Sequence, residues 1–312
     1  MKKKHFSFDS SDGETSIHGI LWIPDKYPKM ILQISHGMTE YVERYDEFGE
    51  FMAEKGVLVI GHDHLGHGLS VTEDDKYGYF AAKGGYEKVV SDIDEIRKVV
   101  QGAYPKLPYY LLGFSMGSFF TRAYLIEKSK GLSGAIIMGT AYRPRMVTAV
   151  GMKLCQAMSA VKGEDYRSKT IKRLATGSFN KKHGKRGDND WLSKNNDNVI
   201  SYNEDPLSAY NFTLNGYYNM FKALHISDDV YKLVKINQYF PLLIMSGGDD
   251  PVGDYGNGIY KVYEQYKDAG CKNVEMMLYA KDRHDILREE DRMTVFEDIY
   301  AWMSLMTYIY NK

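Results

Sequence analysis

The sequence predicts an α/β fold around a central, mostly parallel sheet. Three observations predict it: short apolar runs rich in β-branched residues, amphipathic helix patterns between these runs, and alternation of the two along most of the chain. A strand buried on both faces of a parallel sheet is apolar throughout, which is the pattern of these runs. The chain of 312 residues is long enough for such a sheet and an inserted segment.

Three β-rich segments open the chain, separated by the turn signals SSDG and PDKYPK. The first two fit an antiparallel hairpin at one edge of the sheet. Helices and buried strands alternate after them, and in the second helix Val89, Ile93, Ile96, Val99 and Val100 are expected to share one face. The expected strands are residues 3–9, 15–23, 30–37, 56–63, 108–114, 134–139, 241–248 and 273–280. The expected helices are residues 41–55, 85–104, 119–128, 259–268 and 291–310.

Residues 141–230 break this alternation. The segment is polar and aromatic, with helical patches and no run that is typical of a buried strand. Because it separates two expected strands of the sheet, we interpret it as an inserted lid. The core is then expected to comprise residues 1–140 and 231–312, and the lid residues 141–230.

Composition and charge narrow the functional classes. A formal net charge of −1 gives no overall field for binding nucleic acid or an anionic membrane, and the short basic run at residues 181–186 is typical of solvated surface. Cys155 and Cys271 have no metal or redox spacing, which suggests a reducing compartment. No apolar run has the place of a signal peptide or the length of a membrane span. We therefore expect a cytoplasmic protein without stable membrane insertion.

The segment LLGFSMGSFF contains the pattern G-x-S-x-G at Gly113, Ser115 and Gly117. It lies between an expected buried strand and an expected helix, which is the context of a nucleophile elbow. Side chains two residues before and after the serine would clash in so tight a turn, and glycine avoids this clash. The hydroxyl would then stand at the carboxyl end of the sheet, where α/β folds bind ligands. The alternative is a glycine-rich packing turn without chemistry.

A serine nucleophile needs a general base and an acid that orients this base. Behind such an elbow the chain order is serine, acid, histidine. Two later strands end in matching residues: one is followed by Asp249 and Asp250, and the other by His284. Asp250 is preferred because a proline follows it and fixes a turn, while Asp249 remains an alternative. Asp282 and Asp285 lie too close to His284 in sequence to be its expected partners.

An oxyanion formed during acyl transfer needs two backbone N–H donors. Met116, the residue after the serine, is the first expected donor. The second is expected in the segment ISHGMTEY, where His36 and Gly37 precede Met38 and follow an early strand. Gly37 would let the backbone at Met38 approach a substrate oxygen closely.

Five segments together resemble the α/β-hydrolase superfamily, and within it the monoacylglycerol lipase and lysophospholipase branch of the serine aminopeptidase S33 type. HGMTEYVERY is similar to the pattern H-G-x-x-E-x-x-x-R-Y of that branch. DHLGHGLS is similar to D-x-x-G-H-G-x-S, with Leu65 where arginine is common. GFSMGS, GGDDPVGDYG and YAKDRHDILRE are similar to its elbow, acid loop and histidine loop. The resemblance spans residues 36–288, and the lid matches least well.

The resemblance implies an α/β-hydrolase fold with Ser115, Asp250 and His284 as the catalytic triad and the N–H groups of Met38 and Met116 as oxyanion donors. The implied reaction is hydrolysis of a carboxylic ester through an acyl-enzyme, without a metal or cofactor. The expected partner is a small acyl ester and no nucleic acid.

The lid composition suggests the substrate. Methionines at positions 146, 152 and 158 and an apolar cluster at residues 212–221 could wall a channel for an acyl chain, or form the lid's own small core. A channel for an acyl chain leads us to expect a lipid-like monoester, either a monoacylglycerol or a lysophospholipid. The alternatives are a short-chain or aryl carboxylesterase, a peptidase acting at free N-termini, and a binding protein of this fold without activity.

A metal-dependent hydrolase is a further alternative. His62, His64 and His67 have the spacing H-x-H-x-x-H, close to the H-x-H-x-D-H zinc site of metallo-β-lactamase-like hydrolases. That site needs an aspartate where this chain has Gly66. We therefore prefer a glycine-rich loop with local hydrogen bonds and expect no metal.

Overall fold

The computed structural model describes residues 1–183, 187 and 189–310, so residues 184–186 of the basic run lie outside the described residues. The described residues form an eight-stranded sheet in the order β1-β2-β4-β3-β5-β6-β7-β8. β1 pairs with β2 and β2 with β4 in antiparallel fashion, and all other pairs are parallel. The predicted fold class, with its hairpin at one edge, is confirmed. The strands are β1 (Lys2–Asp9), β2 (Ser16–Ile23), β3 (Met30–Ser35), β4 (Val57–His62), β5 (Tyr109–Phe114), β6 (Gly134–Met138), β7 (Leu242–Gly247) and β8 (Val274–Tyr279).

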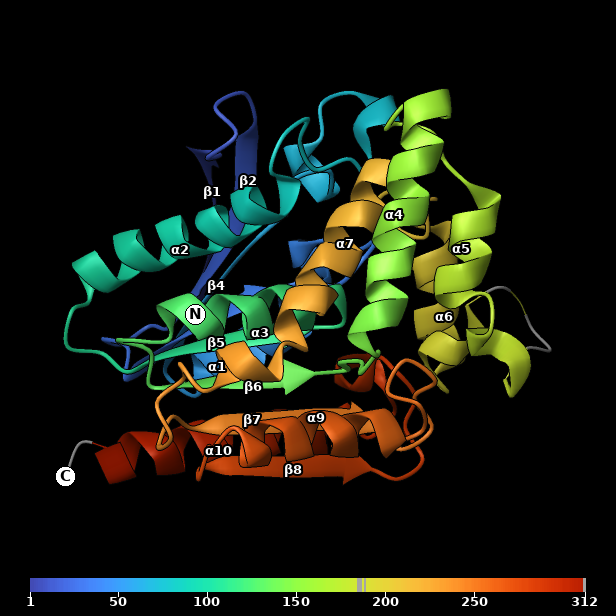
Figure 1. The fold of residues 1–312 in the computed structure, drawn as a ribbon. Helices are drawn as coiled ribbons and strands as arrows, with labels where there is room; N and C mark the ends of the chain where they lie inside the picture. The colour runs from blue at the N-terminus through green and yellow to red at the C-terminus, as the bar shows by residue number, and fades with distance from the viewer. Residues whose placement is uncertain (184–186, 188, 311–312) are drawn as a thin grey trace.

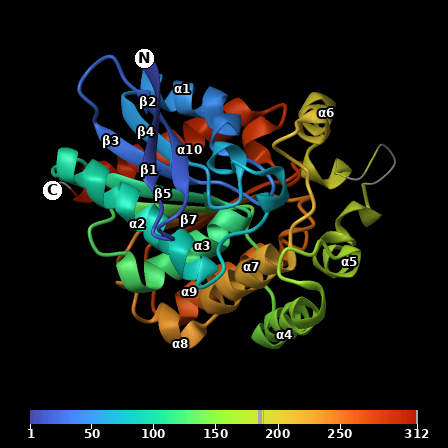
Figure 2. The same cartoon turned by 90° about the horizontal axis from the view of Figure 1, so that it is seen from above.

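Helices cover both faces of the sheet (Figures 1 and 2). One core layer packs under α1 and α10, and the other under α2, α3, α7 and α9. Residues 41–55 were expected to form one helix, but a 3-10 turn at Val42–Tyr45 precedes α1. The α-helices are α1 (Asp46–Glu54), α2 (Gly85–Ala103), α3 (Met116–Lys128), α4 (Arg145–Lys162), α5 (Lys169–Thr176), α6 (Asn196–Glu204), α7 (Leu214–Ser227), α8 (Val230–Leu233), α9 (Asn257–Asp268) and α10 (Arg292–Tyr310).

Two details differ from the sequence prediction. Val99 is 65% exposed, although Val100 beside it is buried, because consecutive residues of a helix point about 100° apart. β8 was expected to be buried on both faces, but it is the edge strand, and Glu275 within it is exposed. Apolar content alone does not distinguish an edge strand from a central one.

The segment 141–230 contains α4 to α7 and no strand among its described residues. In Figure 1 the arrowheads of β6 and β8 point toward the side where α4, α5 and α6 lie. α4 packs against α7, and α7 packs against α3 of the core. The segment therefore lies beside the carboxyl ends of the strands. Within the described part of the chain, no helix has both the length and the apolar character needed to cross a membrane.

Candidate active site

Ser115 occupies a strained turn between β5 and α3. Its φ is 52° and its ψ −121°, a left-handed backbone conformation that non-glycine residues seldom adopt. A Cβ on Gly113 would lie less than 3.0 Å from the hydroxyl of Thr121, and one on Gly117 would overlap the carbonyl of Ser35. Both glycines are thus required where β5, α3 and β3 meet. The fold holds the serine side chain outward at the end of the sheet.

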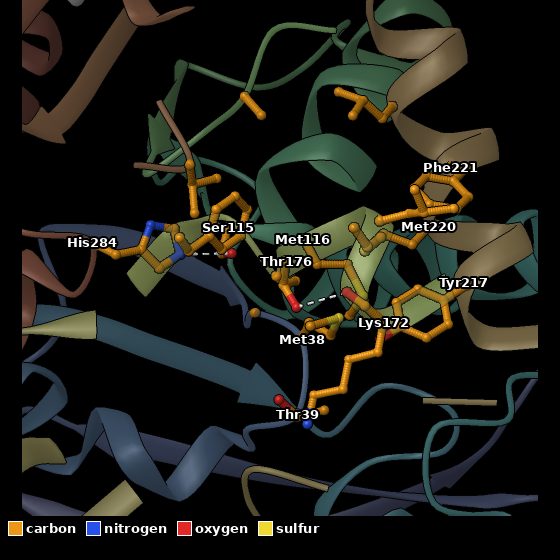
Figure 3. Close-up of a pocket in the computed structure, with 18 of the residues that line it drawn as sticks. Met38, Thr39, Ser115, Met116, Lys172, Thr176, Tyr217, Met220, Phe221 and His284 are labelled. Atoms are coloured by element: carbon orange, nitrogen blue, oxygen red, sulfur yellow. Dashed lines mark hydrogen bonds between the residues drawn. The ribbon is translucent and has the colours of Figure 1, made fainter. Parts of the chain in front are cut away.

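Three loops at the carboxyl end of the sheet bring Ser115, His284 and Asp250 together. The Oγ of Ser115 lies 2.8 Å from Nε2 of His284, and Nδ1 of His284 lies 2.9 Å from Oδ2 of Asp250 (Figure 3). The carboxylate can only accept, so Nδ1–H donates to it and leaves Nε2 free to accept from the serine hydroxyl. Asp250 is fully buried and also accepts from the hydroxyl of Ser246 and the N–H of Val252. These bonds hold the carboxylate against the imidazole.

The other acids near His284 face elsewhere. The side chain of Asp249 is exposed, and among the described residues the hydrogen bonds of Asp249 involve its backbone. Asp282 pairs with Lys194 at 2.6 Å, and both carboxylate oxygens of Asp285 accept from Arg288. Of the two candidates left open by the sequence pattern, Asp250 is therefore the one that contacts the imidazole.

Met38 and Met116 both line the cavity in front of Ser115. Within the described part of the chain, neither backbone N–H has a hydrogen-bond acceptor. The loop carrying Met38 is held by His36, whose Nε2 accepts from the N–H of His64 while Nδ1–H donates to the carbonyl of Gly37. Burial lowers the pKa of His36 and favours this neutral form.

Glu40 is a residue of this loop to which the sequence pattern assigned no role. It is 3% exposed, and its Oε1 accepts from the N–H of Gly37 at 2.6 Å and from the hydroxyl of Tyr45 at 2.7 Å. Its other oxygen faces Arg44 at 3.6 Å and Arg288 at 4.0 Å. A signal for it was present in the segment HGMTEYVERY, which contains this glutamate, an arginine and a tyrosine close together.

Comparisons with known proteins identify the family of this chain. Residues 26–291 match the family described as serine aminopeptidase, S33. The chain belongs to this family. The monoglyceride lipase homolog of Monkeypox virus is 27% identical over 285 residues, which cover 90% of this chain and 92% of that protein. The monoglyceride lipase of Rattus norvegicus is 25% identical, over 91% of this chain and 85% of that protein.

Solved structures show the same fold. A thermostable carboxyl esterase from Bacillus coagulans, in complex with glycerol, superposes with a TM-score of 0.91 at 27% identity, over 98% of this chain and 99% of that chain. A soluble variant of monoglyceride lipase from Saccharomyces cerevisiae gives a TM-score of 0.75 at 17% identity, over 97% and 94% of the two chains. The predicted resemblance to the α/β-hydrolase superfamily is confirmed.

This S33 family member has a cavity of about 620 Å³ in front of Ser115. Its walls are largely apolar, and several come from residues 141–230 (Figure 3). Tyr217, Met220 and Phe221 of the expected apolar cluster line it. The three methionines at 146, 152 and 158 are not among its lining residues, so the channel wall, one of the two interpretations left open, does not apply to them. α4 turns a neighbouring face to the cavity, which carries Val147, Val150, Gly151 and Leu154.

Two aromatic rings enclose His284. The ring centroid of Phe114, at the end of β5, lies 4.8 Å from that of the imidazole, and the ring centroid of Trp191 lies 5.1 Å from it. Both side chains keep the imidazole away from bulk water. The sequence pattern gave no sign of Trp191, because its contact with His284 joins positions far apart in the chain.

Residues 190–195 are fastened to the loop that carries His284. The N–H of Asp285 donates to the carbonyl of Leu192 at 2.8 Å. The buried carboxylate of Glu289 accepts from the backbone N–H groups of Lys194 and Arg283. Trp191 therefore has a fixed place beside the imidazole.

The histidines of the proposed alternative metal motif are buried behind the loop that carries Met38. Rings of His62 and His64 lie 4.8 Å apart, and the ring of His64 lies 4.2 Å from that of His36. The carboxylate of Asp63, between them, accepts from the N–H groups of Val42 and Leu69. In the described part of the chain no group of three or more His, Cys, Asp and Glu side chains is arranged to hold a metal ion.

Proposed function

We propose that this chain is a serine ester hydrolase of the monoacylglycerol lipase-like type, with Ser115 as nucleophile, His284 as general base and Asp250 as the residue that orients His284. The hydrogen-bonded series from Ser115 through His284 to Asp250, at the mouth of an apolar cavity, is the observation that carries this proposal. Relatives named monoglyceride lipase and carboxyl esterase support the ester as the bond cleaved.

In the proposed acylation step, Nε2 of His284 takes the hydroxyl proton of Ser115 while Oγ attacks the ester carbonyl carbon. The carbonyl oxygen becomes an oxyanion, which accepts from the N–H groups of Met38 and Met116. Each such donor contributes roughly 2.7–4 kcal/mol to lowering the barrier. The imidazolium then gives its proton to the alcohol oxygen, the C–O bond breaks, and the alcohol leaves an acyl group on Ser115.

The second half repeats the chemistry with water. His284 takes a proton from water, the resulting hydroxide attacks the acyl carbon, and the same two N–H groups stabilise the oxyanion. The proton returns to Oγ of Ser115, and the carboxylic acid departs. Asp250 stays ionised in both halves and stabilises the imidazolium.

The apolar walls favour a lipid-like monoester over a short-chain ester. A cavity of about 620 Å³ lined by Met220, Phe221 and Leu224 removes an acyl chain from water, at about 0.8 kcal/mol for each methylene buried. We further propose that residues 141–230 form the lid that supplies these walls. Two free, buried cysteines support a reducing, cytoplasmic setting.

The test is covalent labelling with a fluorophosphonate, read by intact-protein mass. We expect one adduct on the natural sequence and none on Ser115→Ala. A chain-length series of esters then separates the substrates, with rates that rise from C4 to longer acyl groups. A folded protein that takes no label would mean a binding protein without an activated serine, and a maximum at C2–C4 would mean a short-chain esterase.

A further inference from the structure

The cavity in front of Ser115 carries an excess of positive charge. Among its lining residues are four cationic side chains, Arg143, Lys169, Lys172 and Arg173, and one carboxylate, that of Glu40. The chain as a whole has a formal net charge of −1, so this excess is local. A neutral ester gives no reason for it.

Glu40 does not neutralise these cations. Its Oε1 is occupied by the N–H of Gly37 and the hydroxyl of Tyr45, and its Oε2 faces Arg44 and Arg288. Its charge is therefore compensated by Arg44 and Arg288.

In the part of the chain that the structure describes, the three cations on α5 have no acidic partner. Among the described residues, no carboxylate comes within 4.0 Å of the charged nitrogens of Lys169, Lys172 or Arg173, whereas Lys194 pairs with Asp282 at 2.6 Å. Positions 169, 172 and 173 are spaced i, i+3 and i+4 on α5, so they share one face of the helix. The last turn of a helix favours a cation such as Arg173, but this effect does not apply to Lys169, the first residue of α5, and does not require the three cations to line a cavity.

The position of Lys172 relates these charges to the reacting ester. A Cβ on Gly37 would lie 3.1 Å from the Cβ of Ser115, so the loop that includes Thr39 runs directly beside the nucleophile. In Figure 3 the side chain of Lys172 extends toward Thr39 and away from Met220 and Phe221. The cation is thus separate from the apolar wall proposed for the acyl chain.

We propose that the preferred substrate is a lipid monoester whose alcohol carries a phosphate with net negative charge, and that Lys172, with Lys169 and Arg173, binds this phosphate. This inference rests on the proposed ester hydrolase activity. An ammonium or guanidinium group bound to a phosphate oxygen forms a charge-assisted hydrogen bond, which is stronger than a bond between neutral groups. A neutral monoacylglycerol with the same acyl chain lacks this bond.

The experiment compares three soluble substrates below their micelle concentration: 1-octanoylglycerol, 1-octanoylglycerol 3-phosphate and 1-octanoylglycero-3-phosphocholine. We expect kcat/KM for the phosphate ester to exceed that for octanoylglycerol by about tenfold at low salt, and the phosphocholine ester to fall between them. The preference should shrink in 0.5 M salt, because solvent-exposed charges are screened.

Variants of Lys172 test whether the cations of α5 cause the preference for the phosphate ester. In Lys172→Met the ratio of kcat/KM for the phosphate ester to that for octanoylglycerol should fall roughly tenfold, and Lys172→Arg should restore most of it. The control is Lys153→Met, which removes an exposed cation of α4 that does not line the cavity. Thermal unfolding of each variant shows that it is folded.

The outcomes separate this inference from the proposed function. Equal kcat/KM for the neutral and phosphate esters would overturn the inference and leave the ester hydrolase proposal intact. So would a preference that appears only on vesicles containing phosphatidylglycerol, because the cations would then serve attraction to a membrane surface. Absence of fluorophosphonate labelling would overturn both.

Discussion

The carboxylate of Glu40 accepts a hydrogen bond at 2.6 Å from the N–H of Gly37, the residue before Met38. This bond fixes the loop beside Ser115 from within, since Glu40 is buried and bound by Tyr45 as well. Thr39, between them, has a φ of 55°, so the loop is also strained at this point. A buried charge thus sets the direction of the backbone N–H groups proposed to bind the oxyanion.

Replacing Glu40 by alanine is expected to lower kcat more than it changes KM. The buried N–H of Gly37 loses its acceptor, which costs about 1–3 kcal/mol, and the loop no longer holds Met38 in place. The measurement is kcat and KM on a soluble ester together with the free energy of unfolding. Tyr45→Phe is the control, because it removes only the second hydrogen bond to the same oxygen. A change in unfolding free energy with unaltered kcat would make Glu40 purely structural.

Asparagine at position 250 is expected to reduce kcat by roughly 10⁴, the effect of removing the charge that orients a triad histidine. Asparagine at position 249 should leave kcat within about twofold, since that side chain is exposed and does not contact His284. Steady-state kinetics on both variants decides between the two acids. Equal losses would contradict the assignment of Asp250.

Alanine at position 117 is expected to destabilise the protein by about 3 kcal/mol or abolish folding. Its methyl group would overlap the carbonyl of Ser35, which is backbone of a central strand and cannot move aside. The matched variant is Gly102→Ala in α2, where the added methyl group meets no atom within 4 Å. Gly102→Ala should stabilise the helix by about 0.5–1 kcal/mol. Denaturant unfolding measures both, and a tolerated Gly117→Ala would refute the steric argument.

Removing one partner of the ion pair between Arg122 and Asp228 is expected to cost about 3–5 kcal/mol. The two side chains are fully buried, 2.5 Å apart, and join α3 to the end of α7. Arg122→Met leaves the carboxylate of Asp228 buried without its cation, so chemical denaturation should occur at lower denaturant concentration. The double variant Arg122→Met/Asp228→Leu should recover part of this loss. If the double variant loses as much unfolding free energy as the two single variants together, an unpaired buried charge would not be the cause of the loss.

Acid is expected to destabilise the fold through the buried histidines. Burial lowers the pKa of His62 to about 3, and burial also lowers the pKa values of His64 and His67 well below the ordinary 6.5. The unfolded chain therefore binds more protons than the folded one between pH 6.5 and 3, and stability is complete above this window and falls as pH falls through it. Each histidine contributes up to about 1.4 kcal/mol per pH unit.

Thermal unfolding at pH 7.5, 6 and 5 measures this slope. His62→Phe should reduce it, because phenylalanine replaces a ring whose nitrogens have no hydrogen-bond partner in the described part of the chain. An identical slope for His62→Phe would show that other groups control acid unfolding.

The sequence predicted those parts of the fold and of the candidate site that leave a pattern in neighbouring residues. Buried strands followed by Ser115, Asp250 and His284 could be recognised, because a strand, a turn and a helix each leave a pattern within about ten residues. The role of Trp191 could not be recognised, because its contact with His284 depends on how distant segments pack. The partners of Glu40 that fix the loop are local, and only its role as a support for the backbone at Gly37 went unassigned. The interpretation of the α4 methionines as a channel wall does not hold for a related reason. Hydrophobicity shows that a helix has an apolar face, but a one-residue rotation decides which side chains meet the cavity.

The fastening of residues 190–195 to the histidine loop restricts how this site can open. We expect Trp191 and His284 to move together, because Glu289 and the N–H of Asp285 join their two segments by hydrogen bonds. We therefore expect the wall beside the imidazole to stay closed during turnover and the substrate to enter the cavity elsewhere. Water for deacylation would then reach the acyl group by the route through which the alcohol left. The alcohol would have to leave before water could reach the acyl group, and a second alcohol bound on this route would compete with water for the acyl group.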